Sequence, residues 1–290
     1  MFTLSLATRR RTKERVMHAL LRSAAFINMG ALLAVCSFVA WNGAQAISWA
    51  FLTQPPRNAM TEGGIWSCIL GTVLLASGAL AVSFPLGVAS AVYLHEYARD
   101  SRFARYIRLG VNNLAGVPSI VFGLFGMSFF VIACGLGISL LSGILTLSVL
   151  TLPVIISTAE EALRQVPMTC REASLALGAT QSQTIFRVVL PSAMPGMLTG
   201  AILGLARAAG ETAVIMFTAA VFFAKPDTGS LLRPVMALPN HIYVLATSST
   251  DMEKTMPLQY GTALVLVLLV TGMNLAAILM RDRLQNRRHP

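Results

Sequence analysis

Charged side chains are scarce in this chain. Only 12% of its 290 residues are charged, whereas 55% are hydrophobic. A soluble domain covers its surface with more charge than that, so the composition excludes an ordinary soluble globular domain. Cysteine and histidine are scarce too, with four of each, and no spacing among them predicts a metal site or a disulfide framework. We therefore expect no metal and no cofactor.

Long uncharged runs predict helices that cross a membrane. A membrane-spanning helix needs about 20 consecutive apolar residues. We expect an all-α membrane protein with one membrane domain over 24–280 and six transmembrane helices. The expected helices are about 24–47, 65–94, 109–133, 138–159, 192–224 and 257–280. Gly135 and Gly137 are placed to turn the chain between the third and the fourth helix.

Basic residues are distributed unevenly along the chain. The net charge of +10 alone is compatible with nucleic-acid binding. Yet 17 of the 22 Lys and Arg residues lie in 1–23, 95–108, 160–191 and 281–290, and only four lie in the loops that alternate with these segments. This alternation is typical of a membrane protein whose basic segments stay in the cytosol. We therefore expect two cytosolic tails, 1–23 and 281–290, that touch membrane lipid and bind no nucleic acid.

The N-terminal apolar run combines features of a cleaved signal peptide and of a retained membrane helix. Residues 44–46 read AQA, which resembles a signal-peptide cleavage site. The apolar core before them is longer than the roughly 7–15 residues of a signal peptide, and a long basic region precedes it. We expect a retained first helix.

Two charges interrupt the fifth apolar run. Arg207 lies near its middle, and Glu211 follows one helical turn later on the same face. Each charge costs on the order of 2.5–3.5 kcal/mol at the centre of a membrane helix. Arginine presents a planar fork that matches an oxyanion, so the pair indicates an anion pathway. A structural salt bridge that holds this helix to a neighbour is the alternative.

The third expected helix contains residues that predict a break. Residues 116–126 read GVPSIVFGLFG, in which Pro118 removes a backbone donor and Gly116 loosens the helix before Ser119. Broken helices often line the cavity of a transporter. A structural kink explains the same residues, so both interpretations stay open.

The loop over 225–256 is long and partly apolar. Its apolar side chains indicate a segment that lies on the membrane surface, covers the outer mouth of a pathway, or binds an external partner. These side chains are Leu231, Val235, Met236, Leu238, Ile242 and Tyr243.

The basic segment 160–191 predicts two short helices joined by a tight turn. Residues 168–177 suit a short helix, Gly178 suits a left-handed C-terminal cap, and Thr180 suits the N-cap of a helix over 181–189. Pro191 then begins the next span. Four apolar side chains of this hairpin are suited to a partner's groove. They are Leu175, Leu177, Ile185 and Phe186.

The same segment resembles the coupling loop of ABC importer permeases. That pattern is Glu-Ala-Ala, three residues, Gly, nine residues, Ile, one residue and Leu-Pro. Ser174 replaces the second Ala, and Val188 replaces the Ile. The matching residues are Glu172, Ala173, Ser174, Gly178, Val188, Leu190 and Pro191. The resemblance implies a type I ABC importer permease fold, and it implies that this loop docks into a separate ATP-hydrolysing subunit.

Further short motifs resemble the permease of bacterial phosphate-uptake ABC transporters, the PstA type. These are EYAR at 96–99, GVPSIVFGLFG, RAAGETA followed by FTA, and MALPNHIY at 236–243. In that family the matching Arg and Glu are taken to lie on the phosphate route, which implies this role for Arg207 and Glu211. Val214 stands where many relatives have Pro, which leaves the choice between the two paralogous permeases open.

The resemblance implies a complex in the cell inner membrane. Its partners would be two copies of the ATPase subunit, a related second permease and a phosphate-binding protein outside, and the permease pair would import phosphate by alternating access. This chain has no P-loop, because the only Lys followed by Ser or Thr is Lys254, and Glu253 precedes it. We therefore expect a transport subunit with no catalytic residues. A permease for molybdate or phosphonate, an ATP-independent secondary transporter and a non-transporting scaffold are the alternatives.

Overall fold

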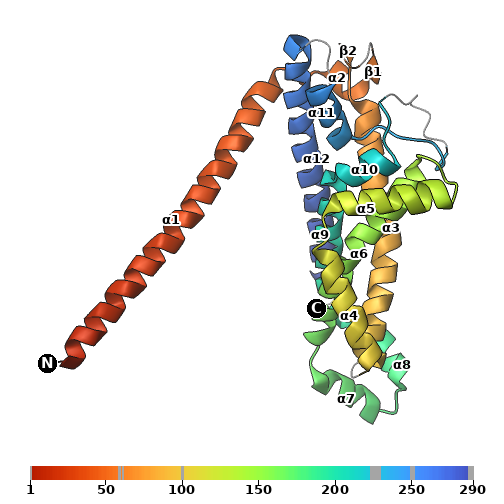
Figure 1. The fold of residues 1–290 in the computed structure, drawn as a ribbon. Coiled ribbons are helices and arrows are strands. Elements are labelled where there is room, and N and C mark those ends of the chain that lie inside the picture. The colour runs from red at the N-terminus through yellow and green to blue at the C-terminus, as the bar shows by residue number, and fades with distance from the viewer. Residues whose placement is uncertain are drawn as a thin grey trace.

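Long helices form most of this protein (Figure 1). The structure is a computed structural model, and it describes residues 2–57, 60, 62–98, 101–222, 230–248 and 252–286. The long helices are α1 (Phe2–Ala44), α3 (Trp66–Val92), α6 (Leu140–Arg164), α9 (Leu190–Gly210) and α12 (Met252–Asn286).

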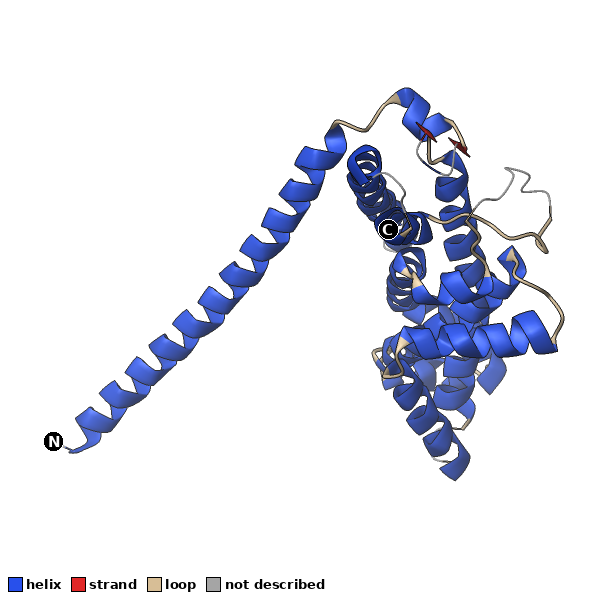
Figure 2. Ribbon diagram, turned by 45° about the horizontal axis from the view of Figure 1, so that its top comes forward, coloured by secondary structure: helices blue, strands red, loops and turns tan. Residues whose placement is uncertain are grey.

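Shorter elements join the long helices. The short α-helices are α2 (Trp49–Thr53), α4 (Arg102–Ala115), α5 (Ser119–Gly126), α7 (Met168–Ala176), α8 (Gln181–Thr184), α10 (Ala213–Thr218) and α11 (Leu238–Thr247). Three π-helical turns are η2 (Tyr93–Tyr97), η3 (Met127–Ala133) and η4 (Ile185–Val189). The small strands β1 (Pro56–Arg57) and β2 (Glu62–Gly63) pair antiparallel at one end of the bundle (Figure 2).

Within the described residues, five helices are long and apolar enough to cross a membrane. They are Val16–Ala44, Trp66–Tyr97, Leu140–Arg164, Gln181–Gly210 and Thr255–Arg283. A sixth span results if Arg102–Ala115 and Ser119–Ala133 count as one broken span, bent by 104°. The expected all-α membrane fold is confirmed.

Two expected spans differ in the structure. The span expected over 109–133 is bent because Pro118 favours an extended residue before it and cannot donate a backbone hydrogen bond. The span expected over 192–224 ends as a regular helix at Gly210. The end of that span after residue 222, Arg99 and residues 287–290 of the expected tail lie outside the described residues. Gly135 and Gly137 have φ of +67° and +65° and turn the chain as expected.

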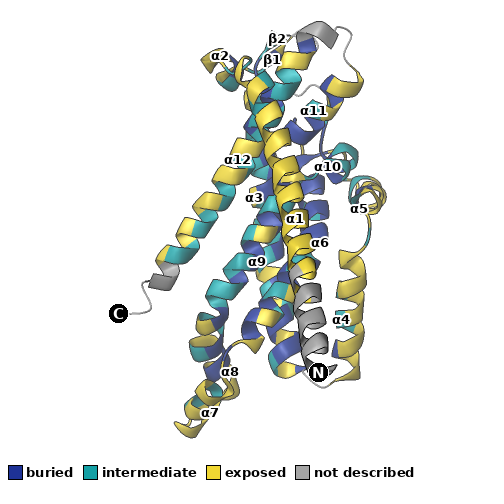
Figure 3. Ribbon diagram, turned by 90° about the vertical axis from the view of Figure 1, so that its left-hand side faces the viewer, coloured by how far each residue is buried: buried dark blue, intermediate teal, exposed yellow. Residues whose placement is uncertain are grey.

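The core lies where α3, α6 and α9 pack together (Figure 3). Small residues of α3 allow close packing, since a β-carbon at Gly87 would lie 2.6 Å from the Cγ2 atom of Ile155 in α6. A buried hydroxyl also joins the two helices, because Ser148 Oγ donates to the Ala79 carbonyl at 3.1 Å. Three helices therefore form a rigid centre around which the shorter elements are arranged.

A glycine in α3 provides a test of this packing. A β-carbon at Gly71 would overlap the backbone carbonyl oxygen of Met236. We expect Gly71→Ala to lower the free energy of unfolding by about 1–3 kcal/mol, as overpacking typically does. The measurement is thermal unfolding of the purified protein in detergent. Gly30→Ala is the control, because among the described residues no atom, the backbone of its own helix aside, lies within 4 Å of a β-carbon there. Equal stability of the two variants would contradict the packing.

The apolar segment near α11 packs largely inside this chain. Val235, Met236 and Leu238, which lie just before α11 and at its first residue, are buried, whereas Leu231 and Tyr243 are exposed. Burial also lowers the pKa of His241 to about 4, so its ring is neutral at pH 7. The buried half of this segment therefore packs against apolar side chains of α3 and α12. Which of the three expected roles the segment has stays a prediction.

The two ends of the bundle differ. α7 and α8 lie together at one end, called here the hairpin end, and α2, β1, β2 and α11 lie at the other (Figure 1). α1 and α12 both extend from the end that carries α11 toward the hairpin end (Figure 1). α1 leans away from the bundle, and none of the residues in its most apolar window is buried. It contacts α12 near its own C-terminal end, where the rings of Phe38 and Tyr260 are 5.6 Å apart.

Candidate functional site

The hairpin end carries two short helices at a tight turn. α7 ends at Ala176, and Gly178 has φ of +85°, a left-handed conformation that only glycine adopts without strain. Thr180 then caps α8. Its Oγ1 accepts from the Gln183 backbone N–H at 3.3 Å, and its own N–H donates to Gln183 Oε1 at 2.9 Å. The helix–turn–helix expected from the sequence is confirmed.

A hydroxyl pair joins the two arms of the hairpin. Ser174 Oγ lies 2.9 Å from Thr184 Oγ1, so the residue that departs from the coupling-loop pattern contributes a bond that Ala could not make. Glu172, Ala173 and Gly178 are exposed on the outside of the turn. This arrangement presents the turn outward while its base is held by the bundle.

The apolar side chains of the hairpin divide into two groups. Leu175, Leu177 and Phe186 are 48%, 90% and 63% exposed. Ile185 is 1% exposed and packs in the core beside Leu163, so its expected place in a partner's groove is wrong. Ile185 faces the bundle because it lies in η4 (Ile185–Val189), where the second arm of the hairpin reaches the core. Exposure of three large apolar side chains at one tip is typical of a surface that another protein covers.

The second arm of the hairpin continues directly into the bundle. α8, η4 and α9 form one uninterrupted membrane-length helix from Gln181 to Gly210. Pro191 therefore lies inside this helix and not at its beginning as expected. The π-helical turn η4 ends at Val189, two residues before the proline, and such turns accommodate a change in the regular hydrogen-bond ladder.

Arg207 and Glu211 lie on opposite sides of a break. Arg207 is in the last turn of α9, where the partial negative charge of a helix C-terminus favours a cation. Glu211 follows Gly210 with φ −74° and ψ 130°, an extended conformation. The expected placement of both residues on one helix face is therefore wrong, because the helix ends between them. Both side chains are half-buried, and no ion pair joins either one to another residue in the described part of the chain.

The two helix breaks lie close together. Gly116 ends α4, Pro118 is the N-cap of α5, and Ser119 is the first residue of α5. A β-carbon at Gly123 in α5 would lie 3.0 Å from the Ala213 carbonyl oxygen in α10. α10 begins two residues after Glu211. The predicted kink at Pro118 therefore exists. It places α5 against α10, the helix that follows the break between Arg207 and Glu211.

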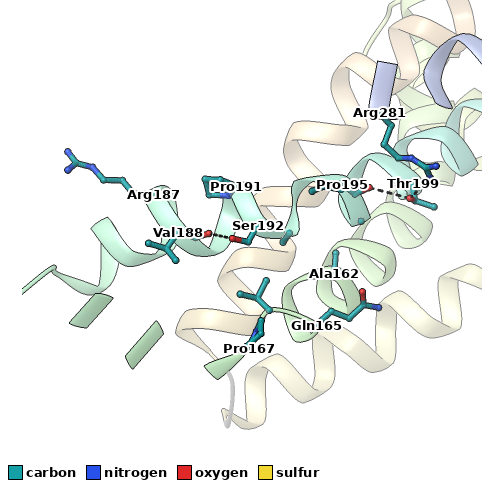
Figure 4. A pocket seen from close by; sticks show the side chains of 13 residues that line it. Ala162, Gln165, Pro167, Arg187, Val188, Pro191, Ser192, Pro195, Thr199 and Arg281 are labelled. Atoms are coloured by element: carbon teal, nitrogen blue, oxygen red, sulfur yellow. Dashed lines mark hydrogen bonds between the residues drawn. The ribbon is translucent and has the colours of Figure 1, made fainter. Parts of the chain in front are cut away.

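A cavity of about 860 Å³ opens along α9 toward the hairpin end (Figure 4). Its wall includes the end of α6, the first turns of α9 and Arg281 of α12, whose Nη1 donates to Thr199 Oγ1 at 3.2 Å. Arg187 is at the rim and points away from the other lining side chains (Figure 4). Sequence reasoning missed this cavity, since its residues come from three segments far apart in the chain.

The family model of binding-protein-dependent transport system inner membrane components matches residues 83–290. The chain belongs to this family. The match includes α5, the hairpin, α9 and α12, so every feature of the site described above lies within it. This member of the family is a multi-pass membrane protein and a transport subunit of the ABC importer class.

Individual proteins resemble this family member over most of their length. A probable ABC transporter permease of Bacillus subtilis (strain 168), YqgI, is 34% identical over 257 residues, which cover 85% of this chain and 87% of that protein. The phosphate transport system permease protein PstA 1 of Mycobacterium tuberculosis (strain CDC 1551 / Oshkosh) is 39% identical over 241 residues, covering 81% and 77%.

A solved structure confirms the permease fold. It is a bacterial alginate ABC transporter in complex with an alginate pentasaccharide-bound periplasmic protein. One of its chains superposes with a TM-score of 0.63, covering 95% of this chain and 96% of its own. The sequence identity is 14%, so this likeness concerns the fold alone.

Proposed function

We propose that this chain is one of two permease subunits of an ATP-driven importer that carries inorganic phosphate across the inner membrane. The observation that carries the proposal is its similarity to phosphate transport permeases of the PstA type, at 39% identity over about four fifths of the chain. The site is consistent with an anion as cargo, because Arg207 can supply a planar fork of donors at the end of α9.

The hairpin is the proposed docking element for an ATPase subunit. Its exposed tip offers Leu175, Leu177 and Phe186 to a groove, and the Gly178 turn keeps the tip compact. The chain lacks a P-loop, so the energy comes from the docked subunit. Two permeases with one hairpin each require two ATPase copies.

The remaining partners fit the other exposed parts of the molecule. α1 projects as a helix with large apolar side chains on its surface, which suits a related second permease and the surrounding lipid. The phosphate-binding protein would meet the end opposite to the hairpin. In this orientation both termini are cytosolic, as the distribution of basic residues indicates.

The two charged residues and the kink are assigned to the route of phosphate. Arg207 lacks an ion-pair partner among the described residues, so its guanidinium remains available to a passing anion. Glu211 and the bend over 116–119 lie beside the crossing of α5 and α10. The cavity on the hairpin side of α9 then provides an exit toward the cytosol.

The test of this function is uptake by membrane vesicles that contain the complete transporter. We expect labelled phosphate to enter only with ATP, and an excess of molybdate or phosphonate to compete poorly. Equal competition by either oxyanion would reject phosphate as the cargo. Counterflow of phosphate without ATP, in vesicles of this chain alone, would reject the ATP-driven mechanism.

The orientation has its own test at Cys170, which is exposed in α7. In a variant that keeps Cys170 alone, we expect a membrane-impermeant thiol reagent to label inside-out vesicles at least about tenfold faster than intact cells, because a bilayer excludes a charged reagent. Permeabilised cells are the control for reactivity. Fast labelling of intact cells would place the hairpin outside and remove the docking role.

A further inference from the structure

Arg171 of α7 is bound to two other helices. Its Nη1 donates to the Val166 carbonyl at 2.6 Å, and its Nη2 donates to the Leu163 carbonyl at 2.9 Å, both at the end of α6. The same Nη2 lies 3.0 Å from Glu96 Oε1 in η2, which extends α3. The side chains of Arg171 and Glu96 are only 12% and 11% exposed. One guanidinium therefore joins α7, α6 and the hairpin end of α3.

Glu96 is likewise the centre of several contacts. Its Oε1 is 2.9 Å from His95 Nδ1, and its backbone carbonyl accepts from Gln181 Nε2 at 3.3 Å. The next residue, Tyr97, has its hydroxyl 3.4 Å from Ser182 Oγ. Gln181 and Ser182 belong to α8, the other arm of the hairpin. The end of α3 is thus connected to both arms.

This pair is not required to close the hairpin. The turn is already closed by Gly178, by the Thr180 cap and by the bond between Ser174 and Thr184. Nor are α7 and the end of α3 neighbours along the chain, since Glu96 and Arg171 lie 75 positions apart. A nearly buried ion pair is costly unless its geometry and hydrogen bonds are complete, and here Arg171 has three acceptors. The pair therefore contributes a connection between α7 and the end of α3, which the local fold of the hairpin does not need.

We propose that Glu96 and Arg171 are a positioning pair that makes the hairpin end of α3 move with the coupling hairpin. This inference rests on the proposed function. When an ATPase subunit displaces α7, the covalent chain transmits the motion to α9, and the Glu96–Arg171 pair transmits it to α3. Both helices line the core, so the two sides of the bundle rearrange together. Without the pair, α7 would lose its direct side-chain connection to α3, and ATP would be hydrolysed without complete opening.

The experiment measures phosphate imported per ATP hydrolysed in the complete transporter reconstituted in liposomes. We expect Glu96→Gln, which keeps the size of the side chain, to lower this ratio by about tenfold, a typical size for a coupling effect. ATP hydrolysis should stay within about twofold of the wild type, and the partner subunits should co-purify in the same proportion. Arg171→Lys should also lower the ratio, because an ammonium cannot hold three acceptors in one plane.

The control is another ion pair near this end of the bundle. Arg108 Nε lies 3.0 Å from Glu160 Oε1, and its Nη2 donates to the Leu94 carbonyl at 2.7 Å, so Arg108 joins α4 to α6 and η2. Glu160 belongs to α6 and not to the hairpin. Glu160→Gln should leave the ratio unchanged.

The double variant Glu96→Gln with Arg171→Lys should lower the ratio no further than the worse single variant, since both substitutions remove the same interaction. Additive losses, an unchanged ratio in Glu96→Gln, or an equal loss in Glu160→Gln would each overturn the proposal. A wild type that imports no phosphate would instead overturn the proposed function.

Discussion

Replacing Arg207 with Gln should reduce ATP-driven phosphate uptake by roughly 10- to 150-fold, because a hydrogen bond to a charged group is worth about 1.5–3 kcal/mol. The guanidinium lies in the last turn of α9, half-buried, and glutamine there keeps the helix while removing the charge. The measurement is the initial rate of labelled phosphate uptake, with the assembled complex quantified on the same membranes.

Two further variants separate a cargo contact from a structural one. Arg207→Lys keeps the positive charge without the planar fork, so its uptake should fall between those of the wild type and Arg207→Gln. Arg281→Gln removes the same charge from α12 near the hairpin end and should have a smaller effect, since its guanidinium already binds Asp282 and Thr199. Loss of assembly in Arg207→Gln would favour the structural salt bridge over the anion pathway.

Replacing Gly178 with Asp should lower ATP-driven uptake below roughly a tenth of the wild-type rate while the chain still inserts into the membrane, because burying an unpaired carboxylate costs several kcal/mol. Among the described residues, and apart from the two chain neighbours of Gly178, no atom lies within 4 Å of a β-carbon at this position, so the new side chain begins in open space. The carboxylate would instead lose its water in the groove of the docked ATPase. The measurement is phosphate uptake together with co-purification of the ATPase.

Asn is the matched control at this position. Both Asp and Asn enter the left-handed region more easily than other side chains, so they place similar strain on the turn. Asn carries no charge and should therefore retain more uptake and more bound ATPase than Asp. Equal loss in both variants would assign the effect to the turn itself. Normal uptake in Gly178→Asp would contradict docking at this surface.

Local sequence signals predicted the hairpin well. Gly favours a left-handed turn, and Thr favours the N-cap of a helix because its hydroxyl accepts a backbone hydrogen bond. The identities of Gly178 and Thr180 therefore predicted the turn and the start of α8. The apolar runs likewise predicted the membrane helices, because a bilayer leaves few alternatives to a helix.

Features that depend on tertiary packing were not predictable in this way. The apolar run after Arg207 does not show that α9 ends at Gly210, since no proline stands at that break. The burial of Met236 and Leu238 depends on α3 and α12, which are distant in the sequence. The Glu96–Arg171 pair joins residues 75 positions apart, and only the packing of η2 against the hairpin brings them together.

The uninterrupted helix from Gln181 to Gly210 has a mechanical consequence. Residues 181–207 span about 39 Å at about 1.5 Å per residue, and a stiff rod pivoting at one end amplifies small rotations at the other. A tilt of about 5° at the hairpin would displace the backbone at Arg207 by about 3 Å, which is the length of one hydrogen bond. A rotation this small is enough to make or release a contact between the guanidinium and a passing anion.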